Sequence, residues 1–525
     1  MQNQINNKSC IKSEEVSFKR RYFAKLISNV VVLVANVLMQ SIIPRALGPA
    51  AYGNFNFITN FFQQLIGFLN LNTSTTFYTK LSQRQDDKGL VLFYLNIMVT
   101  LGLLVATFVM AGFALEMQHL IWPDQKKNIV VLGALWAFLT FSFGIFCEMS
   151  DAYGLTVNAE IAKLALKLFG LLIIVAMFWL NVVTLMNFFA YQLFLLLISL
   201  GIVIWIIHRN GYPFQLNRRL TKWQWQGYGS EFLKFCLPLV LFSGFAALQA
   251  ILERWMLQKY SGSAEQGFYG IALQISSICF LCTSAIVPLL AREYSVSYAK
   301  NDIYEMKRLF LRFVPMLYTI TAYFGCFLAV ESRAVMLLFG GRSYSAAVLP
   351  IAVMCFYPLH QTYGQLNASL FFAAGRTTAY SNIGIVMILI SIPLTFFLIG
   401  PREYGALNGG AAGLAAKMVA IQLLSTNAQL KTLSRLLTLP FLKLLGHQVV
   451  VVLFFVPMAF TASYASEVTL SCRTVLEQFL FSGILYTVAI LVLLLIFPAL
   501  TAMKKEEFQR LWLSLLVRIK GASQK

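Results

Sequence analysis

The strongest constraint on this chain is a succession of apolar runs, each about 20 residues long, separated by short polar turns. A helical run of that length spans the hydrocarbon core of a bilayer. The runs are continuous rather than alternating, so they do not fit the short amphipathic strands of a membrane barrel. Only 12% of the residues are charged, and the mean hydropathy is +0.71, whereas soluble proteins average about 25% charged residues. We therefore predict an all-α polytopic membrane protein.

Fourteen spans are predicted, and no segment between them is long enough for a soluble domain. They lie at about 23–43, 53–77, 90–114, 129–147, 159–180, 182–207, 232–252, 266–290, 309–330, 346–371, 378–399, 405–426, 447–465 and 474–498. We expect a tail (1–22), a six-helix bundle (23–207), a linker (208–231), a second six-helix bundle (232–430), two further spans (431–498) and an amphipathic C-terminal helix (499–525). The first apolar run is expected to be retained, because no cleavage signal follows it.

Basic residues set the predicted orientation. With fourteen alternating spans, about three quarters of the 41 Lys and Arg residues fall on the side of the N-terminus, and such an excess marks the cytoplasmic face. Both termini are therefore expected in the cytoplasm. The net charge of +20 reflects this topology, and we expect no nucleic-acid partner. No metal or other cofactor is predicted, because the cysteines lie mostly inside apolar runs without suitable neighbours.

A hairpin sequence recurs in the second half of the chain. Shifting the segment 44–55 and its neighbourhood by 214 residues pairs Arg45 with Lys259, Gly48 with Gly262, Gly53 with Gly267 and Phe55 with Tyr269. At slightly larger offsets, Asp86 pairs with Asp302 and Gly154 with Gly375. A duplication of this kind is a common plan for transporters. We predict two pseudo-symmetric six-helix bundles plus two extra C-terminal spans.

Polar side chains line one face of the second span, at steps of four, three, four and three residues. They are Asn56, Asn60, Gln63 and Asn70, and the small residue Gly67 lies on the same face. Gln274 lies on the corresponding face of the second half, and His360 lies on a polar face of the tenth span. Amides in hydrocarbon must meet other helices or water. Hydrogen bonds between helices would explain one such face, whereas corresponding faces in both halves favour a hydrated cavity.

A few charges lie where lipid is expected. Lys167 lies deep in the fifth span and Lys417 near the middle of the twelfth, so both are candidates to bind an anionic group. Glu148 and Asp151 flank the end of the fourth span, and Glu253 closes the seventh beside Arg254. These three acids are either loop and interfacial residues or groups that couple transport to an ion.

Several segments resemble bacterial oligosaccharide flippases of the O-antigen type, within the multidrug/oligosaccharidyl-lipid/polysaccharide exporter superfamily. They are PRALGPAAYGNF (44–55), ERWMLQKYSGSAEQGFYG (253–270), VPLLAREYSVSYAKND (287–302), MLLFGGRSYSAAVLPI (336–351), FFAAGRTTAY (371–380) and REYGALNGGAAGLAAK (402–417). The resemblance covers residue 23 to about 430. Family members usually carry Asp where Glu253 stands, and most have twelve spans, although fourteen-span members such as lipid II flippases exist.

The resemblance implies a transporter, not an enzyme, in the bacterial inner membrane. It would move an undecaprenyl-diphosphate-linked oligosaccharide to the outer leaflet for polysaccharide biosynthesis, such as that of lipopolysaccharide O-antigen. Its partners would be this lipid-linked substrate, membrane lipids, and the glycan polymerase and chain-length machinery. The diphosphate would bind Lys167 and Lys417, with Arg45, Arg254 and Arg292 in support. The amide face and His360 would meet the sugars.

Two alternatives stay open from the residues. A drug/cation antiporter of the same superfamily would favour acidic residues deep in a span, where this chain has cations. A membrane-bound glycan polymerase should have a large outer loop, and an acyltransferase should have an essential intramembrane histidine. His360 is the only histidine in the middle of a predicted span.

Overall fold

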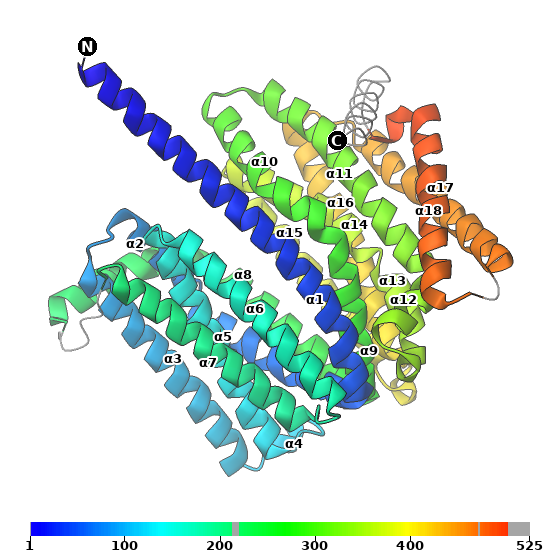
Figure 1. Cartoon of the computed structure of the whole chain (residues 1–525), viewed down its shortest axis with the longest axis horizontal. Coiled ribbons are helices and arrows are strands. Elements are labelled where there is room, and N and C mark those ends of the chain that lie inside the picture. The colour runs from blue at the N-terminus through cyan, green and yellow to red at the C-terminus, as the bar shows by residue number, and fades with distance from the viewer. Residues whose placement is uncertain (1, 213–219, 471–472, 502–525) are drawn as a thin grey trace. The chain divides into compact units, whose positions relative to one another are not determined.

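The computed structural model describes residues 2–212, 220–470 and 473–501, and this part of the chain is made of helices without strands (Figure 1). It divides into two compact units, residues 1–267 and 268–525. The all-α fold of a polytopic membrane protein is thus confirmed. The predicted amphipathic helix of the C-terminus lies outside the described residues from residue 502 onward, as do linker residues 213–219.

The first unit is built around α5, which packs against α1, α3 and α7. Its helices are α1 (Gln2–Asn70), α2 (Thr73–Gln83), α3 (Lys88–Ala114), α4 (Gln118–Ile121), α5 (Lys127–Ala152), α6 (Thr156–Trp179), α7 (Leu185–Arg209), α8 (Lys222–Ser261) and the start of α9 (Ser263–Ser277). Aromatic residues fill much of its core, with Trp122 and Phe62 almost completely buried. The first helix begins at Gln2, so the predicted tail continues directly into the first span.

The second unit has its core between α11, α14, α16 and α17, where Tyr318 and Tyr363 are buried. Its elements are the end of α9, η1 (Ile278–Phe280), α10 (Leu281–Ala299), α11 (Ile303–Val330), α12 (Ser332–Phe339), η2 (Arg342–Ala347), α13 (Val348–Met354), α14 (Tyr357–Ala373), α15 (Thr377–Ile399), η3 (Arg402–Tyr404), α16 (Gly410–Leu437), α17 (Phe441–Thr469), α18 (Val475–Ile496) and η4 (Pro498–Thr501). The helices α17 and α18 pack on each other, and α17 also packs on α11.

Each of the fourteen predicted spans falls largely on helix. Within the described ranges, eight helices are long and apolar enough to cross a membrane. The number is nine if the bent pair Arg342–Met354 and Tyr357–Ala373 counts as one span. The chain is therefore a multi-pass membrane protein, and the total of fourteen spans stays a prediction.

Three spans expected to be continuous are broken. The second span breaks between α1 and α2, where Leu71 and Asn72 have φ of 49° and 61°. The eighth span breaks at η1, between α9 and α10. The tenth breaks between α13 and α14, which are bent by 40°. The first break has a local cause, because Asn tolerates the left-handed conformation and hydroxyl and amide side chains compete with the helical backbone. The sequence LNTSTT (71–76) carries that signal.

The backbone repeats its unusual conformations at the positions that the sequence pairs. Gly48 has φ 73° and ψ 169° inside α1, and Gly262 has φ 85° and ψ 179° after α8. This region is nearly restricted to glycine. Gly154 and Gly375, before α6 and α15, also share a positive φ, of 74° and 64°. The duplicated pattern in the sequence therefore corresponds to a duplicated chain path.

One pairing needs correction by a single residue. Asp87, not Asp86, is the counterpart of Asp302. Asp87 accepts a hydrogen bond from the backbone N–H of Leu90 at 3.0 Å, and Asp302 accepts one from Glu305 at 2.9 Å. Each aspartate caps the helix that it precedes, which is a favourable role for this residue. Sequence comparison could not separate two adjacent aspartates, whereas the cap geometry does.

The two glycine hairpins cross each other inside the first unit. A Cβ added at Gly53 would lie 1.7 Å from the carbonyl oxygen of Ser263, and one added at Gly267 would lie 2.2 Å from that of Pro49. The same 214-residue shift relates both glycines and both carbonyls, so the contact is symmetric. The first unit ends at residue 267, so it includes α8 and these first residues of α9. The predicted domain boundaries stay predictions.

Candidate functional site

The amide face of α1 is left uncovered within the first unit. Gln63 and Gly67 are exposed, and Asn56 and Asn60 are half-buried. The opposite face of the same helix is buried in the core through Phe57 and its neighbours. Asn56 donates to the carbonyl of Tyr52 in its own helix, and the Oδ1 atom of Asn60 is buried without a hydrogen bond from a described residue. This part of the face therefore does not serve to bond described neighbouring helices.

Asn70, the last residue of that face, has a different role. Its Oδ1 accepts hydrogen bonds from Thr73 at 2.6 Å and from Tyr94 at 3.2 Å, and its Nδ2 donates to Ser74 at 3.0 Å. These contacts close the break between α1 and α2 and tie it to α3. Asn70 is only 8% exposed, so in this conformation it stabilises the fold.

The two lysines Lys163 and Lys167 of α6 differ in whether they form an ion pair with a described residue. Lys163 donates to Glu160 at 3.1 Å, one turn earlier. Lys167 lies one turn further into the helix, is half-buried, and forms no ion pair with the described residues. A membrane helix that carries such an ammonium group is suited to bind an anion.

The buried charges at the hairpin crossing are bonded to amides. Arg254 is 8% exposed and donates to Gln266 Oε1 at 3.1 Å, and the Gln266 side chain donates to the Arg254 carbonyl. Glu253 is also 8% exposed and accepts from Gln249 at 2.5 Å. Arg45, the exposed cation of the first hairpin, lies just before the Gly48 kink. Arg254 and Glu253 are therefore both buried, and each is hydrogen-bonded to a different glutamine.

Glu148 and Asp151 lie near the C-terminal end of α5 and are half-buried. The Oε2 atom of Glu148 is buried and has no hydrogen-bond partner among the described residues. An unpartnered carboxylate oxygen in a membrane protein is costly, so a proton or a cation at this position would be stabilising. That is the chemistry expected of a coupling group.

In the second unit, Lys417 is completely buried near the start of α16, and its Nζ lies 3.6 Å from the sulfur of Met418. The helices α13, α14 and α15 pack on α16. Burial of an ammonium group at this depth is costly.

The remaining candidate residues of the second unit differ in their exposure to solvent. Gln274 is half-buried on α9. His360 is 9% exposed on α14, and its ring lies 6.3 Å from that of Tyr318, centroid to centroid. The side chain of Arg292, in the second half of α10, is 78% exposed and lies 3.8 Å from Glu293. In this conformation His360 lies in the core, while Arg292 lies at the surface.

Two polar contacts were missed by reasoning from the sequence. Ser482 of α18 donates to Glu331 at 2.5 Å, and both side chains are buried. Glu231 of α8 bonds Lys80 at 2.7 Å and Arg84 at 2.5 Å. A lone acid at the end of a span, as at Glu331, was the available signal. Its partner is 151 residues away and has no mark in the sequence.

The pKa of Glu231 reflects its two cations. Burial alone would raise the pKa of this carboxyl, but the hydrogen bonds and charges of Lys80 and Arg84 outweigh burial and hold it below its ordinary value. Separately, the described residues contain no group of three His, Cys, Asp or Glu side chains that could hold a metal ion.

No protein-family model and no curated protein matches this sequence. Solved structures do match. The lipid II flippase MurJ, in an inward closed conformation, has a TM-score of 0.62 at 12% identity, over 90% of this chain and 98% of that chain. An inward-facing multidrug resistance MATE family transporter of the MOP superfamily has a TM-score of 0.57 at 12% identity, over 76% of this chain and 92% of the other.

This chain has the fold of MOP-superfamily transporters. A third structure, a MOP-superfamily transporter from Pyrococcus furiosus, agrees with a TM-score of 0.51 at 11% identity, over 79% of this chain and 93% of that chain. Identities this low establish the MOP fold alone.

Proposed function

We propose that this protein is a flippase that moves a polyprenyl-diphosphate-linked oligosaccharide, such as an O-antigen unit on undecaprenyl diphosphate, across the bacterial inner membrane. The observation that carries the proposal is a pair of cations on the helices of a MOP fold, half-buried Lys167 on α6 and completely buried Lys417 on α16, both within predicted spans. A diphosphate cannot enter hydrocarbon unaided, because a desolvated charge is strongly destabilised. Fixed ammonium groups offset that cost.

The division of labour follows from the chemistry of the residues. Lys167 and Lys417 would bind the diphosphate at different stages of the cycle, with Arg45, Arg254 and Arg292 as further cations. The uncovered amides of α1 would meet sugar hydroxyls, because amides both donate and accept. Alternating access in such folds presents the site to each side in turn. Because Lys417 and Arg254 are buried here, they would have to become accessible in another conformation.

The second candidate is a drug/cation antiporter, which the MATE structure favours. In the Pyrococcus furiosus transporter, a binding pocket of reverse polarity suggests a different function. One MOP fold therefore accommodates pockets of different polarity. The membrane cations of this chain favour an anionic substrate. An acyltransferase has less support, since His360 lies in the core. A glycan polymerase has less support because no large outer loop is predicted.

The test is transport of a lipid-linked oligosaccharide by the full chain in cells that lack it. We expect the substrate to accumulate in the cytoplasmic leaflet without the protein. We also expect Lys167→Ala and Lys417→Met to abolish most transport while still reaching the membrane. Lys163→Ala is the matched control, because Lys163 lies one turn from Lys167 but is paired with Glu160. Normal surface-glycan export by both test variants would refute the headgroup assignment.

A further inference from the structure

The first turns of α8 have one face that is firmly attached to the first unit. Tyr228 donates to Asp87 at 2.7 Å, and Glu231 bonds Lys80 and Arg84. Phe232 is 4% exposed and packs on the ring of Phe93 at 5.3 Å. These contacts fix the rotation of the helix about its own axis. The side chains on the other face of these turns are therefore held in a fixed direction.

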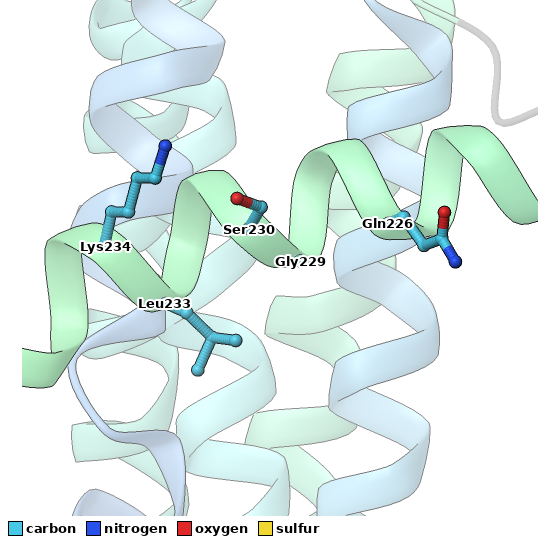
Figure 2. A pocket seen from close by; sticks show the side chains of 5 residues that line it. All are labelled: Gln226, Gly229, Ser230, Leu233 and Lys234. Carbon is cyan, nitrogen blue, oxygen red and sulfur yellow. The ribbon is translucent and has the colours of Figure 1, made fainter.

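A second face of the same turns lines a shallow pocket of about 440 Å³. Its residues are Gln226, Gly229, Ser230, Leu233 and Lys234 (Figure 2). The spacing of three, one, three and one residues forms a single stripe along a helix. The side chains of Lys234 and Ser230 project from the same side of the ribbon in Figure 2. A Cβ added at Gly229 would meet nothing within 4 Å, so the pocket is open there.

The chemistry of this stripe is amphipathic. Lys234 is exposed and forms no ion pair with a described residue, whereas the cations behind the helix are bonded to Glu231. Ser230 and Gln226 add a hydroxyl and an amide. Leu233, which is 63% exposed, adds an apolar surface beside them. Three hydrogen-bond donors next to an apolar side chain suit the junction of a phosphate headgroup and a hydrocarbon chain.

The helix also carries membrane-interface residues one to three turns earlier. Trp223 is 84% exposed and Trp225 is 41% exposed. Exposed tryptophans are typical of the membrane–water boundary, at the depth of lipid headgroups. The predicted orientation places this end of α8 at the cytoplasmic leaflet, where a lipid-linked oligosaccharide would be made available.

We infer that this stripe, residues 226–234 of α8, is the arrival site for the polyprenyl diphosphate. Lys234, Ser230 and Gln226 donate to the phosphate oxygens, while Leu233 and the open surface at Gly229 contact the first isoprene unit. The inference rests on the proposed function and adds a binding site ahead of Lys167 and Lys417. The alternative occupant of the same chemistry is an ordinary anionic phospholipid.

The experiment measures binding of undecaprenyl diphosphate to the full chain in detergent micelles by native mass spectrometry, with phosphatidylglycerol as the competing lipid. Lys234→Gln is expected to weaken binding roughly fivefold, the value of one exposed ion pair. Gly229→Leu fills the pocket and is expected to weaken the binding of undecaprenyl diphosphate more than fivefold. Gly227→Leu is the matched control, because a Cβ at Gly227 also meets nothing within 4 Å and Gly227 does not line the pocket. Lys222→Gln is the corresponding control for charge.

Each outcome decides the matter. Loss of undecaprenyl diphosphate binding in the two stripe variants, with unchanged melting temperatures and normal controls, supports the arrival site. Binding equal to wild type in both variants overturns it, while transport by the wild type leaves the proposed function intact. Equal losses for phosphatidylglycerol also overturn it, because the stripe would then bind any anionic lipid. A wild-type protein that neither binds undecaprenyl diphosphate nor transports its glycan conjugate overturns both proposals.

Discussion

The symmetric crossing of the two hairpins allows a quantitative prediction. An alanine Cβ at position 53 would lie 1.7 Å from the carbonyl oxygen of Ser263, and one at position 267 would lie 2.2 Å from that of Pro49. Real Cβ atoms essentially never come within 3.0 Å of such an atom. The two backbones must therefore separate by about 1.3 Å for Gly53→Ala and about 0.8 Å for Gly267→Ala. Neither backbone can rotate away as a side chain could.

Overpacking of this kind costs about 1–3 kcal/mol in protein cores. We expect Gly53→Ala at or above the upper end and Gly267→Ala at the lower end. Because both substitutions push the same crossing apart, the double variant should lose less than the sum of the two single losses. The assay is the melting temperature of purified protein, followed by fluorescence-detected size exclusion.

Gly144→Ala in α5 is the control, since a Cβ at Gly144 meets nothing within 4 Å. Replacing a glycine inside a helix by alanine should stabilise the protein by about 0.5–1 kcal/mol. If Gly53→Ala melts at or above the wild-type temperature, the close crossing does not exist in the folded protein. The order of the two single variants is a second check, because only the geometry predicts it.

Three further substitutions test contacts inside the two units. Glu231→Gln should reduce stability near neutral pH by no more than about 1 kcal/mol, because solvent screens a pair whose members are each 26% exposed. The pKa of Glu231 is lower in the folded than in the unfolded protein, so the stability that its carboxylate contributes is present above the unfolded pKa and is lost as pH falls through the folded pKa. The melting temperatures of wild type and variant should therefore converge in acid. A difference in melting temperature that stays constant with pH would contradict this. Asn70→Leu should reduce the stability by about 1–3 kcal/mol, because the hydroxyl of Tyr94 loses the acceptor that lies 3.2 Å away. An unchanged melting temperature would show that the hydrogen bonds of Asn70 do not stabilise the break between α1 and α2. Ser482→Ala should cost about 1–3 kcal/mol, because the buried carboxyl of Glu331 loses the hydroxyl that lies 2.5 Å away. Combining it with Glu331→Gln should cost less than the sum of the two single losses, and additive losses would show that the two side chains do not interact.

Much of the fold could be predicted because its signals are local. Apolar runs of spanning length identified the helices, and the positions of Gly48 and Gly262 revealed the repeat before their shared backbone conformation was known. The break at Asn72 was missed because a run of hydrophobicity outweighs one polar cluster in any window average. The adjacent aspartates 86 and 87 could be told apart only by which of them caps the helix.

The candidate site was less predictable, because burial depends on how each helix is rotated against its neighbours. The spacing of the amides on α1 predicted their common face, and the structure leaves that face exposed only at Gln63 and Gly67. No spacing could show that Asn70 bonds Tyr94, or that His360 lies beside Tyr318 in the core. Each of these contacts joins different helices.

The amino-acid sequence by itself determined that this protein resides in a lipid bilayer, that it is helical, and that its two halves repeat one pattern. These follow from hydropathy and from glycines at conformations that other residues avoid, and both are properties of single segments. Only the tertiary structure decided that Arg254 is bonded to Gln266 and that Lys417 is completely buried. It also placed the glycines of both hairpins against each other's backbone. Such contacts arise when helices pack, since packing sets which side chains meet, and segments considered alone do not specify it.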